Sequence, residues 1–178
     1  MINELKLIED AKAGSVTAFT DLVESYRVGL FRFLRTRCSN HADAEDALQD
    51  TLMSAYRYLD SYNPRWRFST WLYRIAIRNA MRNRSSELTG GDEPVSTEND
   101  PLDWVIAQSE RENLWAAAHR LFSDDVYAAM WLRYVEDMSI KDIARVLDHS
   151  VSWTKVNLSR GRKALDAELG QQQSEAYG

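Results

Sequence analysis

Residues 138–165 read MSIKDIARVLDHSVSWTKVNLSRGRKAL, and this stretch predicts two helices joined by a tight turn. Ser139 precedes the first apolar segment and Asp142 follows three residues later, a capping-box spacing that marks a helix start. After the turn, Ser150 predicts a second cap. The following segment has no acidic residue up to Lys163. A short helix, a turn and a basic second helix are the layout of a helix-turn-helix.

The second helix of this motif should have one buried and one exposed face. We expect the buried face to hold Val151, Thr154, Leu158, Gly161 and Leu165. A recognition helix in the major groove directs its first residues to base edges, and the pattern places Ser152, Trp153, Lys155 and Val156 there. Arg160, Arg162 and Lys163 lie further back, where phosphates are the expected targets. The alternative is a helical hairpin with a solvated basic end, but the two caps favour DNA binding.

A second basic run lies in the N-terminal half. Between Ser61 and Ser86 there are six arginines and no acid. Aromatic rings at Tyr62, Trp66 and Phe68 precede a predicted helix cap at Ser69, whereas the later ring of Trp71 is expected in the core. Arginines hold phosphates and exposed rings stack on unpaired bases, so this run predicts binding to single-stranded or unstacked nucleic acid. The alternative for Phe68 is a place in the core.

Acidic residues are gathered in two other runs. Four lie between Cys38 and Asp50, and six lie between Ser85 and Trp104. Segregated charge creates local fields that the net charge of −5 hides, and an acidic patch fits a basic partner. The first run sits at the start of a predicted helix capped by Asn40, so part of its charge can simply stabilise the positive helix end.

Composition predicts an all-α protein, because the 178 residues include only seven glycines and three prolines. We expect two small helical domains, 1–84 and 104–170, joined by a flexible acidic linker, 85–103, and followed by a disordered tail, 171–178. One cysteine and three histidines predict no metal site, and recognised catalytic motifs are missing from the sequence, so no enzyme activity and no cofactor are expected. The sequence lacks a signal peptide and a long apolar stretch, which predicts a cytoplasmic protein without membrane insertion.

Three segments in order carry a family resemblance: ADAEDALQDT at 42–51, FSTWLYRIAIRNA at 68–80, and the stretch from Leu132 to Leu165. With an acidic linker between the second and third, the chain resembles a bacterial extracytoplasmic-function (ECF) sigma factor of the sigma-70 family. The resemblance covers roughly 18–84 and 114–169. It implies a protein that binds core RNA polymerase and directs promoter recognition and strand opening.

The resemblance also implies a role for each surface. The helix after Asn40 matches the surface that docks on the clamp helices of the largest polymerase subunit, and its docking residues are Asp43, Asp46, Gln49, Asp50 and Met53. The next segment matches the part that opens the minus-ten element and holds a flipped base. The implied minus-ten residues are Tyr62, Arg65, Trp66, Arg67, Phe68, Ser69, Thr70, Arg74, Arg78, Asn79 and Arg82.

The C-terminal motif matches the reader of the minus-thirty-five element. The implied residues are Ser150, Ser152, Trp153, Lys155, Val156, Ser159, Arg160 and Lys163. The family further implies contact with the flap of the second-largest polymerase subunit, an anti-sigma factor as partner, and a linker whose acids mimic RNA charge near the active site. Two alternatives stay open from the residues alone: a stand-alone helix-turn-helix regulator, and a helical adaptor or anti-sigma-type interaction protein.

Overall fold

The computed structural model of the chain describes the backbone of residues 3–38, 40–87 and 110–176, and the side chains of residues 3–38, 40–80, 114–115 and 117–170. The described backbone contains helices, turns and loops and no strand, which confirms the all-α prediction. The chain divides into two compact units, Met1–Val95 and Ser96–Gly178. Their boundary falls inside the predicted linker, whose residues 88–103 lie outside the description. The predicted domain limits stay a prediction.

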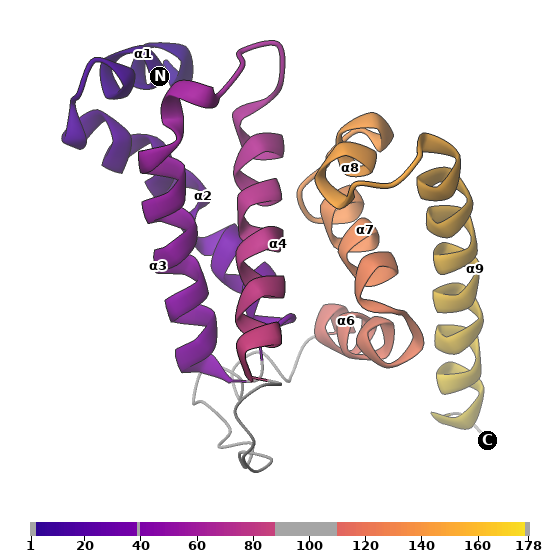
Figure 1. Cartoon of the computed structure of the whole chain (residues 1–178). Helices are drawn as coiled ribbons and strands as arrows, with labels where there is room; N and C mark the ends of the chain where they lie inside the picture. The colour runs from indigo at the N-terminus through magenta and orange to yellow at the C-terminus, as the bar shows by residue number, and fades with distance from the viewer. Residues whose placement is uncertain (1–2, 39, 88–109, 177–178) are drawn as a thin grey trace. The chain divides into compact units, whose positions relative to one another are not determined.

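The first unit is built on a hairpin of two helices, with a further helix packed against both of them. Its elements are α1 (Glu4–Lys12), α2 (Val16–Arg35), α3 (His41–Arg57), the 3-10 turn η1 (Leu59–Ser61) and α4 (Phe68–Glu87). Helices α3 and α4 lie side by side in opposite directions, joined through η1 and the loop after it (Figure 1). The α2 residues Leu30, Phe33 and Leu34 are buried in the core of this unit. The ring of Phe33 meets that of Tyr73 on α4 edge-on at 5.5 Å.

Local capping explains where the first helices begin. The hydroxyl of Ser15 accepts the Ala18 N–H at 3.2 Å, and the side chain of Asn40 accepts the Asp43 N–H at 2.9 Å. Each such cap satisfies one backbone donor that the helix itself leaves unpaired. Between α1 and α2, Gly14 has φ +101, a value that side-chain-bearing residues rarely adopt. The predicted cap of α3 is confirmed and lies at Asn40.

Helix α4 differs from the sequence prediction in its start and in its buried face. It begins at Phe68, one residue before Ser69, so the predicted cap at Ser69 is wrong. Trp71, expected in the core, is half-buried, whereas Tyr73 and Ile77 are buried. Because α4 packs against both α2 and α3, its buried face is wider than one amphipathic stripe.

The second unit contains, in its described part, α6 (Glu110–Leu121), α7 (Asp124–Tyr134), α8 (Ile140–Leu147) and α9 (Val151–Ala176). Its core includes Met130, Leu132, Met138 and Ile143, each at most 2% exposed. Helices α8 and α9 form the predicted helix-turn-helix, joined by a turn in which Asp148 adopts a left-handed conformation with φ 59.

Both caps of the helix-turn-helix are confirmed. The hydroxyl of Ser139 accepts the Asp142 N–H at 3.1 Å, and that of Ser150 accepts the Trp153 N–H at 3.0 Å. The disordered tail predicted at 171–178 is corrected for residues 171–176, because α9 continues to Ala176; the last two residues lie outside the described part. Glutamine, glutamate and alanine are good helix formers, so the sequence after Gly170 can extend a helix that packing has already started.

Two general features of the described residues concern possible partners. None of the helices there is both long and apolar enough to cross a membrane. In the same part of the chain, His, Cys, Asp and Glu side chains do not gather in a group of three that could hold a metal ion.

Candidate functional site

The predicted docking residues share one side of α3, which we call the acidic face: Asp43, Asp46, Gln49, Asp50 and Met53. The helix buries its opposite side through Ala44, Ala47 and Thr51. Asp46, Gln49 and Met53 are exposed, and Asp43 and Asp50 are half-buried. The spacing of three or four residues therefore places these side chains on one side of the helix, as predicted. It presents the carboxylates of Asp43, Asp46 and Asp50 next to the apolar side chain of Met53.

Asp43 has a structural task besides any contact with a partner. Its carboxylate accepts a hydrogen bond from the Asn40 amide at 2.7 Å, while its own N–H donates to the Asn40 side-chain oxygen. This reciprocal pair closes the first turn of α3, where a negative charge also suits the helix dipole. Asp46 and Asp50 are the carboxylates of the acidic face without that capping role.

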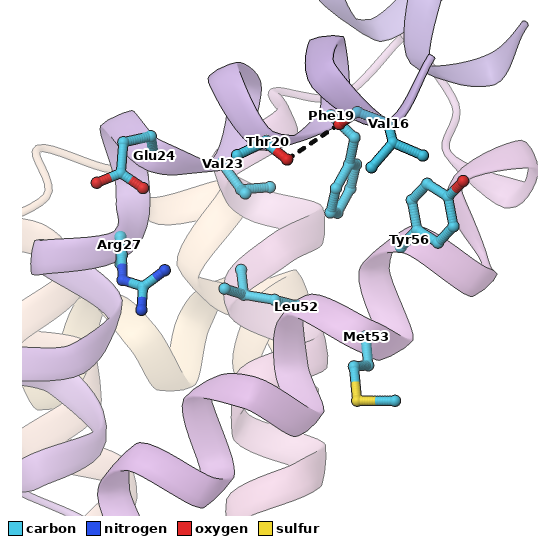
Figure 2. A pocket seen from close by; sticks show the side chains of 9 residues that line it. All are labelled: Val16, Phe19, Thr20, Val23, Glu24, Arg27, Leu52, Met53 and Tyr56. Atoms are coloured by element: carbon cyan, nitrogen blue, oxygen red, sulfur yellow. Dashed lines mark hydrogen bonds between the residues drawn. The ribbon is translucent and has the colours of Figure 1, made fainter. Parts of the chain in front are cut away.

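An apolar groove of about 310 Å³ adjoins the acidic face between α2 and α3 (Figure 2). Its lining residues are Val16, Phe19, Thr20, Val23, Glu24, Arg27, Leu52, Met53 and Tyr56. Val16, Met53 and Tyr56 are 61%, 62% and 45% exposed, unusual values for large apolar side chains that lie so close together. Sequence reasoning missed Val16 and Tyr56, because they lie on different helices and only the fold joins them.

The loop before α4, residues 63–67, is exposed throughout, and we call it the arginine loop. It contains Arg65, Trp66 and Arg67, and the Trp66 ring is 39% exposed. The side chain of Asn63 accepts the Arg65 N–H at 2.9 Å, and its carbonyl accepts the Trp66 N–H at 3.1 Å. On α4, Arg78 is exposed and Arg74 half-buried. These arginines and the indole form a basic surface with one accessible ring.

The other rings of this segment lie beneath the loop. Tyr62 is 4% exposed and Phe68 is completely buried, with ring centroids 5.4 Å apart. The Trp71 ring lies 5.5 Å from Phe68, and the Tyr26 ring of α2 lies 5.7 Å from Phe68 on another side. The prediction that the Tyr62 and Phe68 rings are exposed is therefore wrong, because Tyr26 of α2 packs on Phe68 and Trp71 packs on Tyr62.

Two tyrosine hydroxyls of this cluster have raised pKa values. Burial, followed by a hydrogen bond to the Glu4 carboxylate, raises the pKa of Tyr26 well above its ordinary value. Burial and the charge of Glu4 likewise raise the pKa of Tyr62. Both groups therefore stay protonated at neutral pH and act as hydrogen-bond donors. The Tyr62 hydroxyl donates to the Trp66 carbonyl at 2.6 Å.

Four further predicted minus-ten residues lie in α4. Thr70 is 4% and Asn79 7% exposed, and the Asn79 amide donates to the Ser54 hydroxyl on α3 at 3.4 Å. The Asn79 bond links α4 to α3. Both side chains are buried in this structure, and their predicted contact with DNA stays a prediction. Ser69 is half-buried, and Arg82 lies outside the described side chains.

The predicted recognition helix α9 presents a continuous polar and basic face. Its exposed residues among those predicted are Ser152, Lys155, Val156, Ser159, Arg160 and Lys163, together with the capping residue Ser150. Thr154, Leu158, Gly161 and Leu165 are buried as predicted. Val151 is a correction, because it is 38% exposed: it stands at the open first turn, before α9 packs against α7 and α8.

Trp153 is half-buried rather than exposed, since a histidine covers one side of it. The ring of His149 stacks on its indole with centroids 3.8 Å apart and an interplanar angle of 11°. The Nε2 atom of His149 lies 2.8 Å from the Asp125 carboxylate at the start of α7. The turn and the first turn of α9 are thus tied to α7, an arrangement that sequence reasoning missed although His149 and Trp153 are four residues apart.

Comparison with known protein families explains why these surfaces occur together. Residues 22–87 match sigma-70 region 2, and residues 124–165 match sigma-70 region 4. The first match spans the acidic face and the arginine loop, and the second spans the helix-turn-helix. The chain belongs to the sigma-70 family. It is an ECF sigma factor, a factor of transcription initiation.

Individual relatives agree with that assignment over nearly the whole chain. The ECF RNA polymerase sigma factor SigW of Bacillus subtilis is 27% identical, with 92% of this chain and 95% of the relative covered. The ECF RNA polymerase sigma-E factor of Haemophilus influenzae is 25% identical, with coverage of 94% and 96%. Among solved structures, CnrH in complex with the cytosolic domain of CnrY matches with a TM-score of 0.70 at 25% identity, covering 93% of this chain and 96% of CnrH.

Proposed function

We propose that this sigma factor binds core RNA polymerase through the acidic face of α3, opens the minus-ten element with the arginine loop and α4, and reads the minus-thirty-five element with α9. The observation that carries the proposal is the pairing of one acidic and one basic surface in the first unit. A duplex-binding regulator needs the basic recognition helix alone, whereas a subunit that must hold a polymerase and melt DNA needs both surfaces. Action on RNA polymerase would place the protein in the cytoplasm.

Docking is supported by the chemistry of the acidic face and the adjoining groove. Asp46 and Asp50 offer carboxylates to a basic partner, and Met53 leads from them into the groove. A charged rim beside a hydrophobic centre is the usual build of a protein interface. The clamp helices of the largest polymerase subunit are the partner that the family resemblance implies, with the flap of the second-largest subunit as the contact of the second unit.

Charge reversal tests the docking proposal. We expect Asp46→Lys with Asp50→Lys to weaken recovery of core polymerase in a pull-down, because attraction becomes repulsion at a loss of several kcal/mol. The matched control is Glu9→Lys with Asp10→Lys, which makes the same charge change on exposed residues of α1. Undiminished polymerase recovery by the α3 variant would remove the docking assignment.

Strand opening rests on Trp66 rather than on the buried rings. An exposed indole among arginines can stack on a base that has left the duplex, and such stacking contributes about 1–3 kcal/mol. We expect Trp66→Ala to leave formation of the closed complex unchanged and to reduce the permanganate reactivity of unpaired thymines. Tyr58→Ala is the control, since that ring is 56% exposed outside the arginine loop. Equal thymine reactivity in both variants contradicts the assignment.

The whole proposal is tested by run-off transcription with core polymerase and the full chain. A sigma factor should shift promoter DNA only when core enzyme is added, and it should then start transcripts at a defined position. A stand-alone helix-turn-helix regulator would shift the DNA by itself and would not support run-off. That result would replace the present proposal.

An anti-sigma factor is the further partner that we propose on the family resemblance. A solved structure of similar fold contains CnrH with a second protein, the cytosolic domain of CnrY. For this chain, the expected partner is a protein that competes with core polymerase for the first unit. Its addition should abolish run-off transcription and lower polymerase recovery together; a binding protein that does neither is not an anti-sigma factor.

A further inference from the structure

Helix α1 precedes the part of the chain that matches sigma-70 region 2, yet its last residue touches the segment that leads into the arginine loop. The ammonium of Lys12 donates a hydrogen bond to the backbone carbonyl of Tyr62 at 3.0 Å. The same ammonium lies 5.7 Å from the centroid of the Tyr62 ring. A cation over an aromatic face is attracted by the ring electrons, so both contacts hold Lys12 at Tyr62.

Tyr62 connects this contact to the loop. Its ring is fixed by Phe68 at 5.4 Å and by Trp71 at 5.6 Å. Its hydroxyl donates to the backbone carbonyl of Trp66 at 2.6 Å. One buried side chain therefore holds the backbone of Trp66, while its own backbone is held by Lys12. Lys12 is thus linked through Tyr62, fifty positions later in the chain, to the backbone of Trp66.

The other end of α1 reaches the same aromatic cluster. The Glu4 carboxylate accepts a hydrogen bond from the Tyr26 hydroxyl, and the Tyr26 ring lies 5.7 Å from Phe68, the first residue of α4. Ile8 and Ala11 are buried between these two contacts. Helix α1 is thus attached at both ends to the rings that lie beneath the arginine loop.

A helix held in this way can fix the conformation of the arginine loop before DNA binds. A loop that must capture an unstacked base works best when its backbone already has the required conformation, because ordering it later would cost conformational entropy. A contact that fixes the loop should therefore affect strand opening, where the loop acts, and leave duplex binding and polymerase docking unchanged.

We propose that α1 positions the strand-opening loop, with Lys12 and Glu4 as its positioning residues. They hold Tyr62 and Tyr26, and through them the Trp66 backbone and the start of α4. The inference rests on the proposed strand-opening function of the arginine loop. It assigns a task to the helix that precedes the matched region.

The test compares Lys12→Met with Lys6→Met in the full chain bound to core polymerase. Both remove one positive charge from α1, and Lys6 is an exposed residue of the same helix, so it is the matched control. We expect Lys12→Met to slow strand opening about tenfold, measured by permanganate reactivity over time, as the loss of one hydrogen bond in the opening step would. Lys6→Met should open DNA at the wild-type rate. Transcription from a pre-melted template should be equal in both variants.

One further variant and two further measurements separate the positioning role of Lys12 from other roles. Lys12→Arg retains a cationic donor and should recover most of the opening rate, whereas a lowered Tm together with slow opening in both Lys12 variants would mean that α1 only stabilises the fold. If Lys12 instead contacts DNA phosphates, Lys12→Met will weaken closed-complex binding and reduce its salt dependence, which overturns the positioning role.

The failure of the inference is distinguishable from failure of the loop proposal. If Trp66→Ala slows opening and Lys12→Met does not, the loop retains its function and α1 has no part in it. If Trp66→Ala has no effect, the loop proposal fails and the positioning role of α1 fails with it.

Discussion

The arginine loop and the first turns of α9 are both basic and both carry a tryptophan, but they are held in different ways. The start of α9 is held mainly by nearby residues, with one distant link from His149 to Asp125 of α7: Ser150 caps the Trp153 N–H, and the Asn157 amide donates to the Trp153 carbonyl at 2.9 Å. The arginine loop is fixed from far away, by Lys12 of α1 and by rings of the cluster beneath it. Local contacts tolerate damage elsewhere in the unit, whereas a loop held by distant contacts depends on the whole unit.

The largest expected effect concerns the cluster beneath the loop. Phe68→Ala removes a fully buried ring and should lower the free energy of unfolding by about 3–5 kcal/mol. Trp66→Ala, two residues earlier and exposed, should change it by no more than about 0.5 kcal/mol. Thermal and urea unfolding of the two variants measure the difference. Equal stability would mean that the arginine loop does not rest on a packed core.

The next effect concerns the reading face of α9. Lys155→Ala should lower discrimination at one or two base pairs of the upstream element by about 1–3 kcal/mol, if this exposed ammonium meets base edges. Arg162→Ala should weaken binding on all sequences alike and reduce its salt dependence. Binding to a set of single-base variants of the promoter, with core polymerase present, separates the two. Uniform losses in both variants would show that Lys155 does not read bases.

The smallest effect tests the local support of α9. Ser150→Ala removes the cap that accepts the Trp153 N–H and should cost about 1 kcal/mol of stability. Ser152→Ala, exposed on the same turn, is the control and should be nearly neutral. Urea unfolding followed by circular dichroism measures both. A cost well above this range would indicate that the start of α9 also depends on distant contacts, as the arginine loop does.

The difference between nearby and distant contacts also explains which features could be predicted from the sequence. Helix types, the caps at Asn40, Ser139 and Ser150, and the buried face of α9 depend on residues within one or two turns, and the pattern contains that information. The exposure of the acidic face followed from helical spacing in the same way.

The errors concern residues whose surroundings come from elsewhere in the chain. The position of Tyr62 and Phe68 before the predicted cap at Ser69 indicates exposed rings, but Tyr26 packs on Phe68 and Trp71 packs on Tyr62. The groove that joins Val16 to Tyr56 has no sequence signal, because the contact between α2 and α3 creates it. Trp153 is an intermediate case: the stacking histidine is four residues away, and helical spacing alone could have indicated it.

The length of α9 has a mechanical consequence. Twenty-six residues at about 1.5 Å each make a rod of about 39 Å, and its reading end lies at one tip. A tilt of about 5° around the far end would displace that tip by about 3 Å, roughly one base-pair step. Close packing at Gly161 limits this tilt of α9. A Cβ there would lie 2.9 Å from the Met130 sulfur, so α9 is seated directly against α7 at a point that leaves little room to swing.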